Sequence, residues 1–186
     1  LDVNYDKLEE LVNFHIDNGT DAIIICGTTG ESATLSMEEH RKTIKSCVEF
    51  AKGRIPVVAG TGSNNTKTAI RHAKEAEEDR ADAALIVTPY YNKATQTGLV
   101  KHYSMIADET KLPIILYNVP SRTGTNIAPE TVAELFKTKS NIVGLKEATG
   151  NMAQASKTMA LCDGKLELYS GEDGLVVPLM SIEAIG

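Results

Sequence analysis

The chain has 186 residues, of which 42% are hydrophobic and 24% charged, and its formal net charge is −6. These values are ordinary for a soluble globular protein, and they argue against binding to a membrane or to the backbone of a nucleic acid. The three cysteines, Cys26, Cys47 and Cys162, form no C-x-x-C pair, and the four histidines lack metal-site spacing. We therefore expect free thiols, no metal and a reducing cytoplasmic location.

Helical and extended patterns alternate along the chain. The N-terminus reads as an acidic amphipathic helix, with Leu8, Leu11 and Val12 on one face, and it does not resemble a signal peptide. Short apolar runs then recur about every 25–33 residues, the length of one βα unit. We predict strands at 22–26, which includes Cys26 as a buried thiol, and at 55–59, 84–88, 113–117, 141–145 and 166–169.

Local signals mark several helix ends between these strands. Ser36 and Glu39 form a predicted capping box, and Gly53 is expected to end the helix that follows. Pro129 is placed for the first turn of a later helix. No linker or low-complexity segment interrupts the series, so we expect a single domain.

Strands that alternate with helices predict a parallel sheet covered by helices. Two architectures fit this pattern, a doubly wound open sheet and a closed (β/α)8 barrel. Six strands can be counted, whereas a closed barrel requires eight. Counting alone therefore favours the open sheet.

The segments that follow the strands are polar and rich in glycine, and both architectures place function there. Nucleotide binding is poorly supported, because GTGSNN (60–65) lacks a third glycine and GTTGES (27–32) lacks the Lys-Ser/Thr ending of a P-loop. Backbone N–H groups and hydroxyls in such loops suit a small carboxylate instead.

Lys146 ends the apolar run 141–145, where an ammonium group is costly to bury. A structural reading pairs it with Glu147 or another carboxylate. A functional reading makes it a neutral amine that forms a Schiff base with a carbonyl compound. Tyr117 ends the preceding strand and could relay protons, and Arg122 could hold a carboxylate, although each also has an ordinary structural explanation. With Thr28 and Thr29, these residues favour carbanion chemistry on a keto acid.

Several long motifs resemble the dihydrodipicolinate synthase family: GTTGESATLSMEEH, AGTGSNN, TPYYNK, YNVPSRTG, GLKEATGN and YSGED. The resemblance runs in order over essentially the whole chain. It implies an α/β fold of the (β/α)8 TIM-barrel type, with about six of the eight strands present in residues 1–186. The family's first strand, eighth strand and C-terminal helical region would then be missing from this incomplete barrel domain.

The resemblance also implies a reaction, the condensation of pyruvate with L-aspartate 4-semialdehyde on the route to diaminopimelate and lysine. It needs no metal or organic cofactor, since the lysine forms the covalent pyruvate Schiff base. By position, the implied catalytic residues are Lys146, Tyr117, Thr28 and Tyr91, and the implied substrate-binding residues are Thr29, Arg122 and Gly171.

Related keto-acid aldolases such as N-acetylneuraminate lyase remain an alternative, as does a catalytically silent barrel fragment. Arg122 favours the synthase because it suits a second small carboxylate. The resemblance further implies a homo-oligomer, a tetramer or dimer, formed through Tyr90 and Tyr91. The family's lysine-inhibition site is only partly matched, by Ser32, Ala33, His40, Asn64 and Tyr90, while Met37 and Thr68 replace a histidine and a glutamate, so we expect weak or absent inhibition by lysine.

Overall fold

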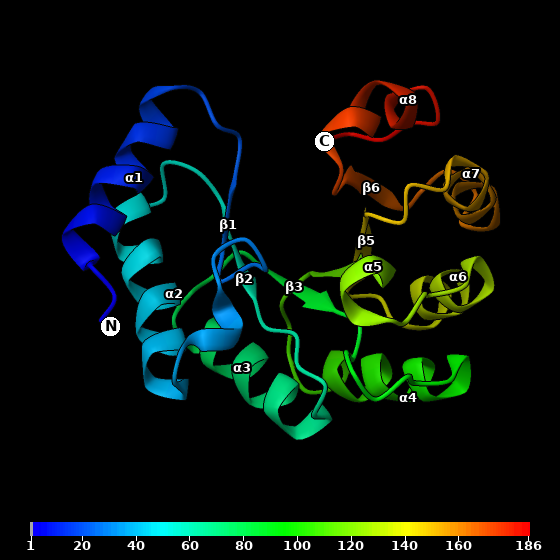
Figure 1. Ribbon diagram of the computed structural model, residues 1–186, viewed down its shortest axis with the longest axis horizontal. Helices are drawn as coiled ribbons and strands as arrows, with labels where there is room; N and C mark the ends of the chain where they lie inside the picture. The colour runs from blue at the N-terminus through cyan, green and yellow to red at the C-terminus, as the bar shows by residue number, and fades with distance from the viewer. Residues whose placement is uncertain (1) are drawn as a thin grey trace.

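The structure, a computed structural model, describes residues 2–186. Within these residues, six strands form one parallel sheet (Figure 1). Each predicted apolar run overlaps one strand, with ends that agree within two residues. The strands are β1 (Ile23–Ile25), β2 (Val57–Gly60), β3 (Ala83–Val87), β4 (Ile114–Asn118), β5 (Ile142–Glu147) and β6 (Glu167–Ser170).

The order of the strands decides between the two architectures. Each strand pairs in parallel with the next one along the chain, in the order β1-β2-β3-β4-β5-β6. A doubly wound sheet would instead reverse its order at a switch point. The open sheet favoured by counting strands is therefore wrong, and the fold is an arc of a (β/α)8 TIM barrel. Counting failed because the spacing of apolar runs reveals the βα alternation but not which strands pair.

The longer helices α1, α2, α3, α4, α6 and α7 follow one another in chain order around the outside of the strands, whereas the short α5 lies inward of α6 (Figure 1). No helix in residues 2–186 combines the length and apolar character needed to cross a membrane. The α-helices are α1 (Tyr5–Asp17), α2 (Met37–Ala51), α3 (Thr66–Glu78), α4 (Gln96–Ala107), α5 (Pro120–Thr123), α6 (Pro129–Thr138), α7 (Met152–Leu161) and α8 (Val176–Met180), and the short 3₁₀ helices are η1 (Ser32–Thr34) and η2 (Asp173–Leu175).

The two faces of the sheet have different cores. Alternate residues of a strand point to opposite faces, so each strand contributes to both. The outer face packs against the helices through fully buried residues such as Ile86, Leu116 and Leu145. The inner face carries a smaller apolar cluster, here called the inner cluster, formed by Val58, Leu85, Ile115, Tyr117 and Val119. Residues of β5 that alternate with Leu145 therefore face the inner cluster.

Most local signals in the sequence are confirmed. Ser36 and Glu39 form both hydrogen bonds of a capping box, and Pro129 occupies the first turn of α6. Helix α2 ends at Ala51, and Lys52 adopts the left-handed conformation before Gly53 does. The placement of Cys26 within a strand is wrong, because β1 ends at Ile25 and Cys26 turns the chain with a φ of 56°. Cys26 is nevertheless the buried free thiol that was expected, as are Cys47 and Cys162.

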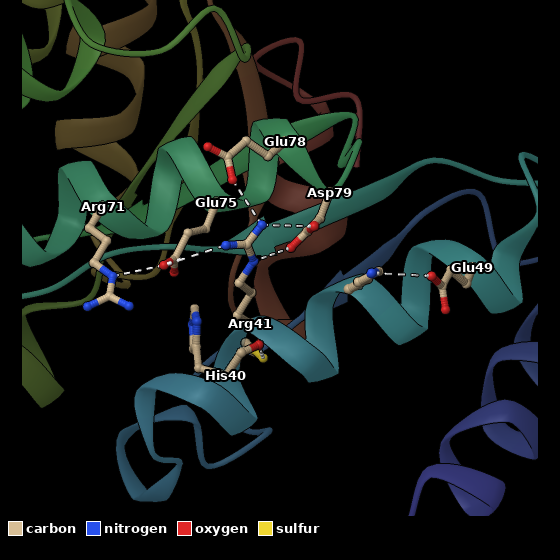
Figure 2. Close-up of polar contacts among 9 residues, drawn as sticks. His40, Arg41, Glu49, Arg71, Glu75, Glu78 and Asp79 are labelled. Atoms are coloured by element: carbon tan, nitrogen blue, oxygen red, sulfur yellow. Dashed lines mark hydrogen bonds and ion pairs between the residues drawn. The ribbon is translucent and has the colours of Figure 1, made fainter.

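A set of ion pairs joins α2 to the C-terminal end of α3 (Figure 2). Arg41 donates from Nε to Asp79 Oδ2 at 2.9 Å and from Nη2 to Asp79 Oδ1 at 3.3 Å. The same Nη2 donates to Glu78 Oε2 at 2.9 Å. Because His40 precedes Arg41 on α2, this paired guanidinium also fixes the part of α2 that carries His40.

Candidate active site

Lys146 lies on the inner face of β5, between two tyrosines. The strand register sets Tyr117 of β4 opposite Lys146 on one side and Tyr169 of β6 opposite it on the other. Its Nζ lies 4.7 Å from the centroid of the Tyr117 ring. The two neighbouring strand ends therefore bring together the amine and the phenol that were singled out from the sequence.

The amine of Lys146 has no carboxylate partner within residues 2–186. Glu147 follows it on β5 and therefore points to the opposite face, where its Oε1 accepts the N–H of Thr149 at 2.6 Å. Burial lowers the pKa of Lys146, and no nearby charge opposes that effect. The structural reading, an ion pair with Glu147, is thus not what the structure contains.

Gly171 brings backbone close to the same lysine. Its N–H donates to the carbonyl of Glu147 at 2.7 Å. A Cβ added to Gly171 would lie 2.7 Å from the Cβ of Ala148 and 3.4 Å from Cε of Lys146. A side chain at position 171 would therefore press on the segment that carries the amine.

A cavity of about 410 Å³ lies beside this group, at the carboxyl ends of β1 to β4. Val119 belongs to both the inner cluster and the cavity wall, whereas Lys146 and Tyr117 do not line the cavity. Of the predicted site residues, those that line it are Thr28, Arg122, Ser32, Ala33, His40 and Tyr90. The predicted site residues thus fall into two adjoining groups, one around the amine of Lys146 and one that lines the cavity.

Arg122 is the cation at this cavity. It lies on the short helix α5 rather than in an irregular loop, because Pro120 begins one helical turn there. Within residues 2–186 no carboxylate forms an ion pair with its guanidinium. An unpaired guanidinium at a cavity wall can bind a carboxylate through two parallel hydrogen bonds.

Three predicted residues lie apart from both groups. Thr29 is exposed on the turn after β1. Tyr91 is 91% exposed and has a φ of 72°, which is unusual for a tyrosine. Asn64 connects two loops, because its Nδ2 donates to the carbonyl of Tyr90 and to Oδ1 of Asn92, each at 3.2 Å. The structure of this chain does not bring Thr29 or Tyr91 into contact with Lys146.

Tyr169 and His72 were not identified from the sequence. Tyr169 is the second register partner of Lys146, and His72 lines the cavity. The alternation in LELY (166–169) could have indicated that Tyr169 faces inward, opposite to the buried Leu166 and Leu168. His72 carries no comparable signal, because it is one polar residue on an amphipathic helix.

His40 and His72 stack on one another at the cavity wall, with ring centroids 4.1 Å apart and an interplanar angle of 19°. His40 Nε2 lies 2.9 Å from the carbonyl oxygen of Gly60, and His72 Nε2 lies 3.3 Å from Sδ of Met37. Burial, and then the proximity of His40, lowers the pKa of His72 to about 4. Burial also lowers the pKa of His40. Both rings are therefore neutral at pH 7.

This pair makes acid destabilise the fold. In the unfolded chain a histidine has a pKa of about 6.5, whereas in the folded chain the pKa of His72 is about 4. Between these two pH values the unfolded chain therefore binds one more proton than the folded chain does. We expect the free energy of unfolding to decrease as the pH is lowered through this range, by about 2–3 kcal/mol for His72 alone. Urea titrations at several pH values test this: His72→Gln should flatten the dependence, whereas His15→Gln, at an exposed position, should not. Equal slopes in wild type and His72→Gln would contradict it.

The sequence model of the dihydrodipicolinate synthetase family matches residues 2–186. The chain belongs to this family. A 4-hydroxy-tetrahydrodipicolinate synthase of Lachnoclostridium phytofermentans is 57% identical over 185 residues, which are 100% of this chain and 63% of that protein. The predicted family resemblance is therefore confirmed.

Solved structures of the family superimpose closely. The dihydrodipicolinate synthase of Aquifex aeolicus is 48% identical, with a TM-score of 0.96 over 98% of this chain and 62% of that one. A chloride-inhibited dihydrodipicolinate synthase of Acinetobacter baumannii, solved with pyruvate, is 48% identical, with a TM-score of 0.94 over the same shares. The chain thus spans about 63% of the length of the family members that it matches.

Within residues 2–186 no group of three or more His, Cys, Asp or Glu side chains is placed to hold a metal ion. The polar groups that this part of the barrel gathers are one amine, phenols, hydroxyls, one guanidinium and the stacked imidazoles of His40 and His72. The amine and the phenol suit covalent and acid–base chemistry, and the guanidinium suits a small carboxylate.

Proposed function

We propose that the chain acts in the condensation of pyruvate with L-aspartate 4-semialdehyde to give 4-hydroxy-tetrahydrodipicolinate, a lyase-class reaction of lysine and diaminopimelate biosynthesis. The observation that carries the proposal is the amine of Lys146, which is unpaired, partly desolvated and 4.7 Å from the centroid of the Tyr117 ring. A lowered pKa increases the neutral fraction of the amine at pH 7, and only the neutral form attacks a carbonyl. Membership of the family supports the choice of reaction.

In this mechanism Lys146 Nζ attacks the keto carbon of pyruvate. The carbinolamine then loses water to leave an iminium, and loss of a methyl proton converts the iminium into an enamine. The enamine carbon attacks the aldehyde carbon of the semialdehyde, whose oxygen takes up a proton. Hydrolysis or ring closure then frees the lysine. The iminium nitrogen accepts the electron pair of the C–H bond when the methyl proton is lost, and the enamine returns a pair when its carbon attacks the aldehyde, so the lysine itself supplies the electron sink and the chemistry requires no metal or organic cofactor.

The other residues take supporting roles in the proposal. Tyr117, with its ring against the amine, is assigned the proton transfers, with Thr28 and Tyr91 as further members of the relay. Arg122, an unpaired cation at the cavity wall, is assigned the carboxylate of the semialdehyde. Thr29 and the backbone of Gly171 are assigned to bound pyruvate. Arg122 favours a small dicarboxylate product over the sugar product of a neuraminate lyase.

The assembly is also part of the proposal. Tyr91 is 91% exposed, and Tyr90 beside it is 37% exposed. A second copy of the chain that covered these rings would bury Tyr91 and could bring it to a neighbouring site, which is why we propose a homo-oligomer. We further propose a cytoplasmic protein with these two substrates and no nucleic-acid or membrane partner.

Reductive trapping tests the proposed function. The folded chain is incubated with pyruvate and sodium borohydride, and the modified peptide is identified by mass spectrometry. We expect one reduced pyruvate adduct on Lys146. Absence of an adduct from folded protein would refute the activity of this chain and favour a catalytically silent barrel fragment.

Lysine should inhibit weakly or not at all. Met37 and Thr68 both line the cavity, and neither carries a negative charge that could form an ion pair with the ammonium group of an amino acid. The loss of a charge-assisted hydrogen bond weakens binding by about 1–3 kcal/mol. The rate of adduct formation is measured with and without millimolar lysine, using Thr68→Glu as the matched variant, in which we expect sensitivity to increase. Strong inhibition of wild type would contradict this prediction.

A further inference from the structure

Tyr169 closes the side of Lys146 opposite to Tyr117. Its ring packs between two glycines: a Cβ added to Gly144 would lie 3.3 Å from Tyr169 Cε2, and one added to Gly186 would lie 3.0 Å from Tyr169 Cδ1. Gly144 precedes Lys146 by two residues, so both lie on the same face of β5. The ring of Tyr169 therefore occupies the space that a side chain at position 144, one step below Lys146 on the same face, would fill.

The hydroxyl of Tyr169 has a separate contact. It donates to Oε2 of Glu167 at 2.8 Å, and both residues point to the inner face because they alternate on β6. Glu167 is in register with Gly144, one step below the pair formed by Lys146 and Tyr169. Lys146 and Glu167 are therefore diagonal neighbours on the inner face of the parallel pair β5–β6. Of the two carboxylates carried by β5 and β6, Glu167 is the one on the same face as Lys146, and it accepts the hydrogen bond of Tyr169.

Few other charges face the amine. On β4 the titratable group is Tyr117, on β6 they are Glu167 and Tyr169, and on β5 Glu147 points to the outer face. After β6, Glu172 and Asp173 follow Gly171, and neither forms an ion pair with Lys146 within residues 2–186. Arg122 lies at the neighbouring cavity. The other members of the inner cluster, Val58, Leu85, Ile115 and Val119, are apolar. A pairing between Glu167 and Lys146 would therefore place a negative charge beside the amine on an otherwise largely apolar face.

We propose that Tyr169 is a positioning residue that keeps the amine of Lys146 unpaired, because its ring fills the space one step below Lys146 on the same face and its hydroxyl holds the carboxylate of Glu167. The inference rests on the proposed function, in which the neutral amine attacks pyruvate. An ion pair with Glu167 would stabilise the ammonium form and slow that attack. Tyr169 acts through Lys146 and needs no contact with a substrate.

The test measures the pKa of Lys146 directly and without pyruvate. The folded chain is labelled with trace acetic anhydride over a range of pH, and the acetylation of the Lys146 peptide is compared with that of an exposed lysine such as Lys165. Tyr169→Phe keeps the ring and frees Glu167, so we expect the titration midpoint of Lys146 to rise by about one pH unit. Glu167→Gln alone should change the midpoint by less than half as much, and the double variant should resemble Glu167→Gln.

Three results would overturn the inference. They are an unchanged midpoint in Tyr169→Phe, a rise that persists in the double variant, or a full-unit decrease in Glu167→Gln alone. Thermal melts check that the variants fold. If Tyr169→Phe does not fold, the titration midpoint of Lys146 in Glu167→Gln still tests the inference. Pyruvate trapping by wild type is measured separately. If the midpoints shift as expected but wild type traps no pyruvate, only the proposed function is refuted. If wild type traps pyruvate but the midpoints do not shift as expected, only the role of Tyr169 is refuted.

Discussion

Replacing Lys146 with methionine is expected to remove borohydride-trapped pyruvate from the chain. Methionine has a similar length and fills irregular space well, but it has no nucleophilic nitrogen. The tyrosine on each side, Tyr117 and Tyr169, would keep its position, because both are held by the strand register rather than by the lysine. The variant therefore removes the proposed reaction and leaves the inner face of the sheet intact.

The stability of Lys146→Met separates this loss from misfolding. The ammonium of Lys146 is partly buried without a carboxylate partner, a state that burial disfavours. We therefore expect the urea midpoint of Lys146→Met to equal or exceed that of wild type. Adduct yield is measured by intact mass after treatment with pyruvate and borohydride.

The matched control for this variant is Lys157→Met. Lys157 lies on α7, is exposed, and pairs with Glu130 of α6 on the outer surface of the molecule. Its replacement should leave the adduct yield unchanged. An adduct of undiminished yield in Lys146→Met would assign the Schiff base to another lysine and refute the proposed mechanism.

Part of this site could be predicted because neighbouring strands carry it. Tyr117 and Lys146 each end an apolar run, and ends of adjacent parallel strands meet at one edge of a sheet. The structure sets them opposite one another, although the register shifts between Ile114 and Ile115 along the same pair of strands. The sequence shows which residue ends each strand, whereas the register that aligns Tyr117 with Lys146 depends on how the strands pair across the sheet.

Other features depended on contacts that no local pattern records. Counting strands favoured the wrong architecture because apolar spacing is the same in an open sheet and in a barrel, whereas the family resemblance predicted the barrel correctly. Cys26 reads as the last residue of an apolar run, yet it turns the chain with a positive φ. Thr28 and Arg122 come together at a cavity because the loops after β1 and β4 fold over the same strand ends. Tyr169 was overlooked because LELY was interpreted as an apolar run rather than as two alternating faces.

Replacing Gly60 with alanine is expected to cause a large loss of stability. A Cβ at position 60 would lie 2.2 Å from the carbonyl oxygen of Cys26, 2.7 Å from its carbonyl carbon and 3.2 Å from the carbonyl oxygen of Ile25. These atoms belong to the backbone at the end of β1, which cannot move aside as a flexible side chain can. Overpacking of this kind costs about 3 kcal/mol or slightly more. Urea titration measures the decrease in the free energy of unfolding.

Gly174→Ala is the matched control, because a Cβ at position 174 would meet no atom within 4 Å. Its effect should stay within about 0.5 kcal/mol. Similar midpoints for the two variants would mean that the backbone after β1 does not press on Gly60.

A second readout concerns the site: Thr28 follows Cys26 by two residues, and the ring of His40 contacts the carbonyl of Gly60 at 2.9 Å. A displaced Cys26 would move both residues of the cavity wall, so folded Gly60→Ala should also trap pyruvate more slowly, whereas Gly174→Ala should not.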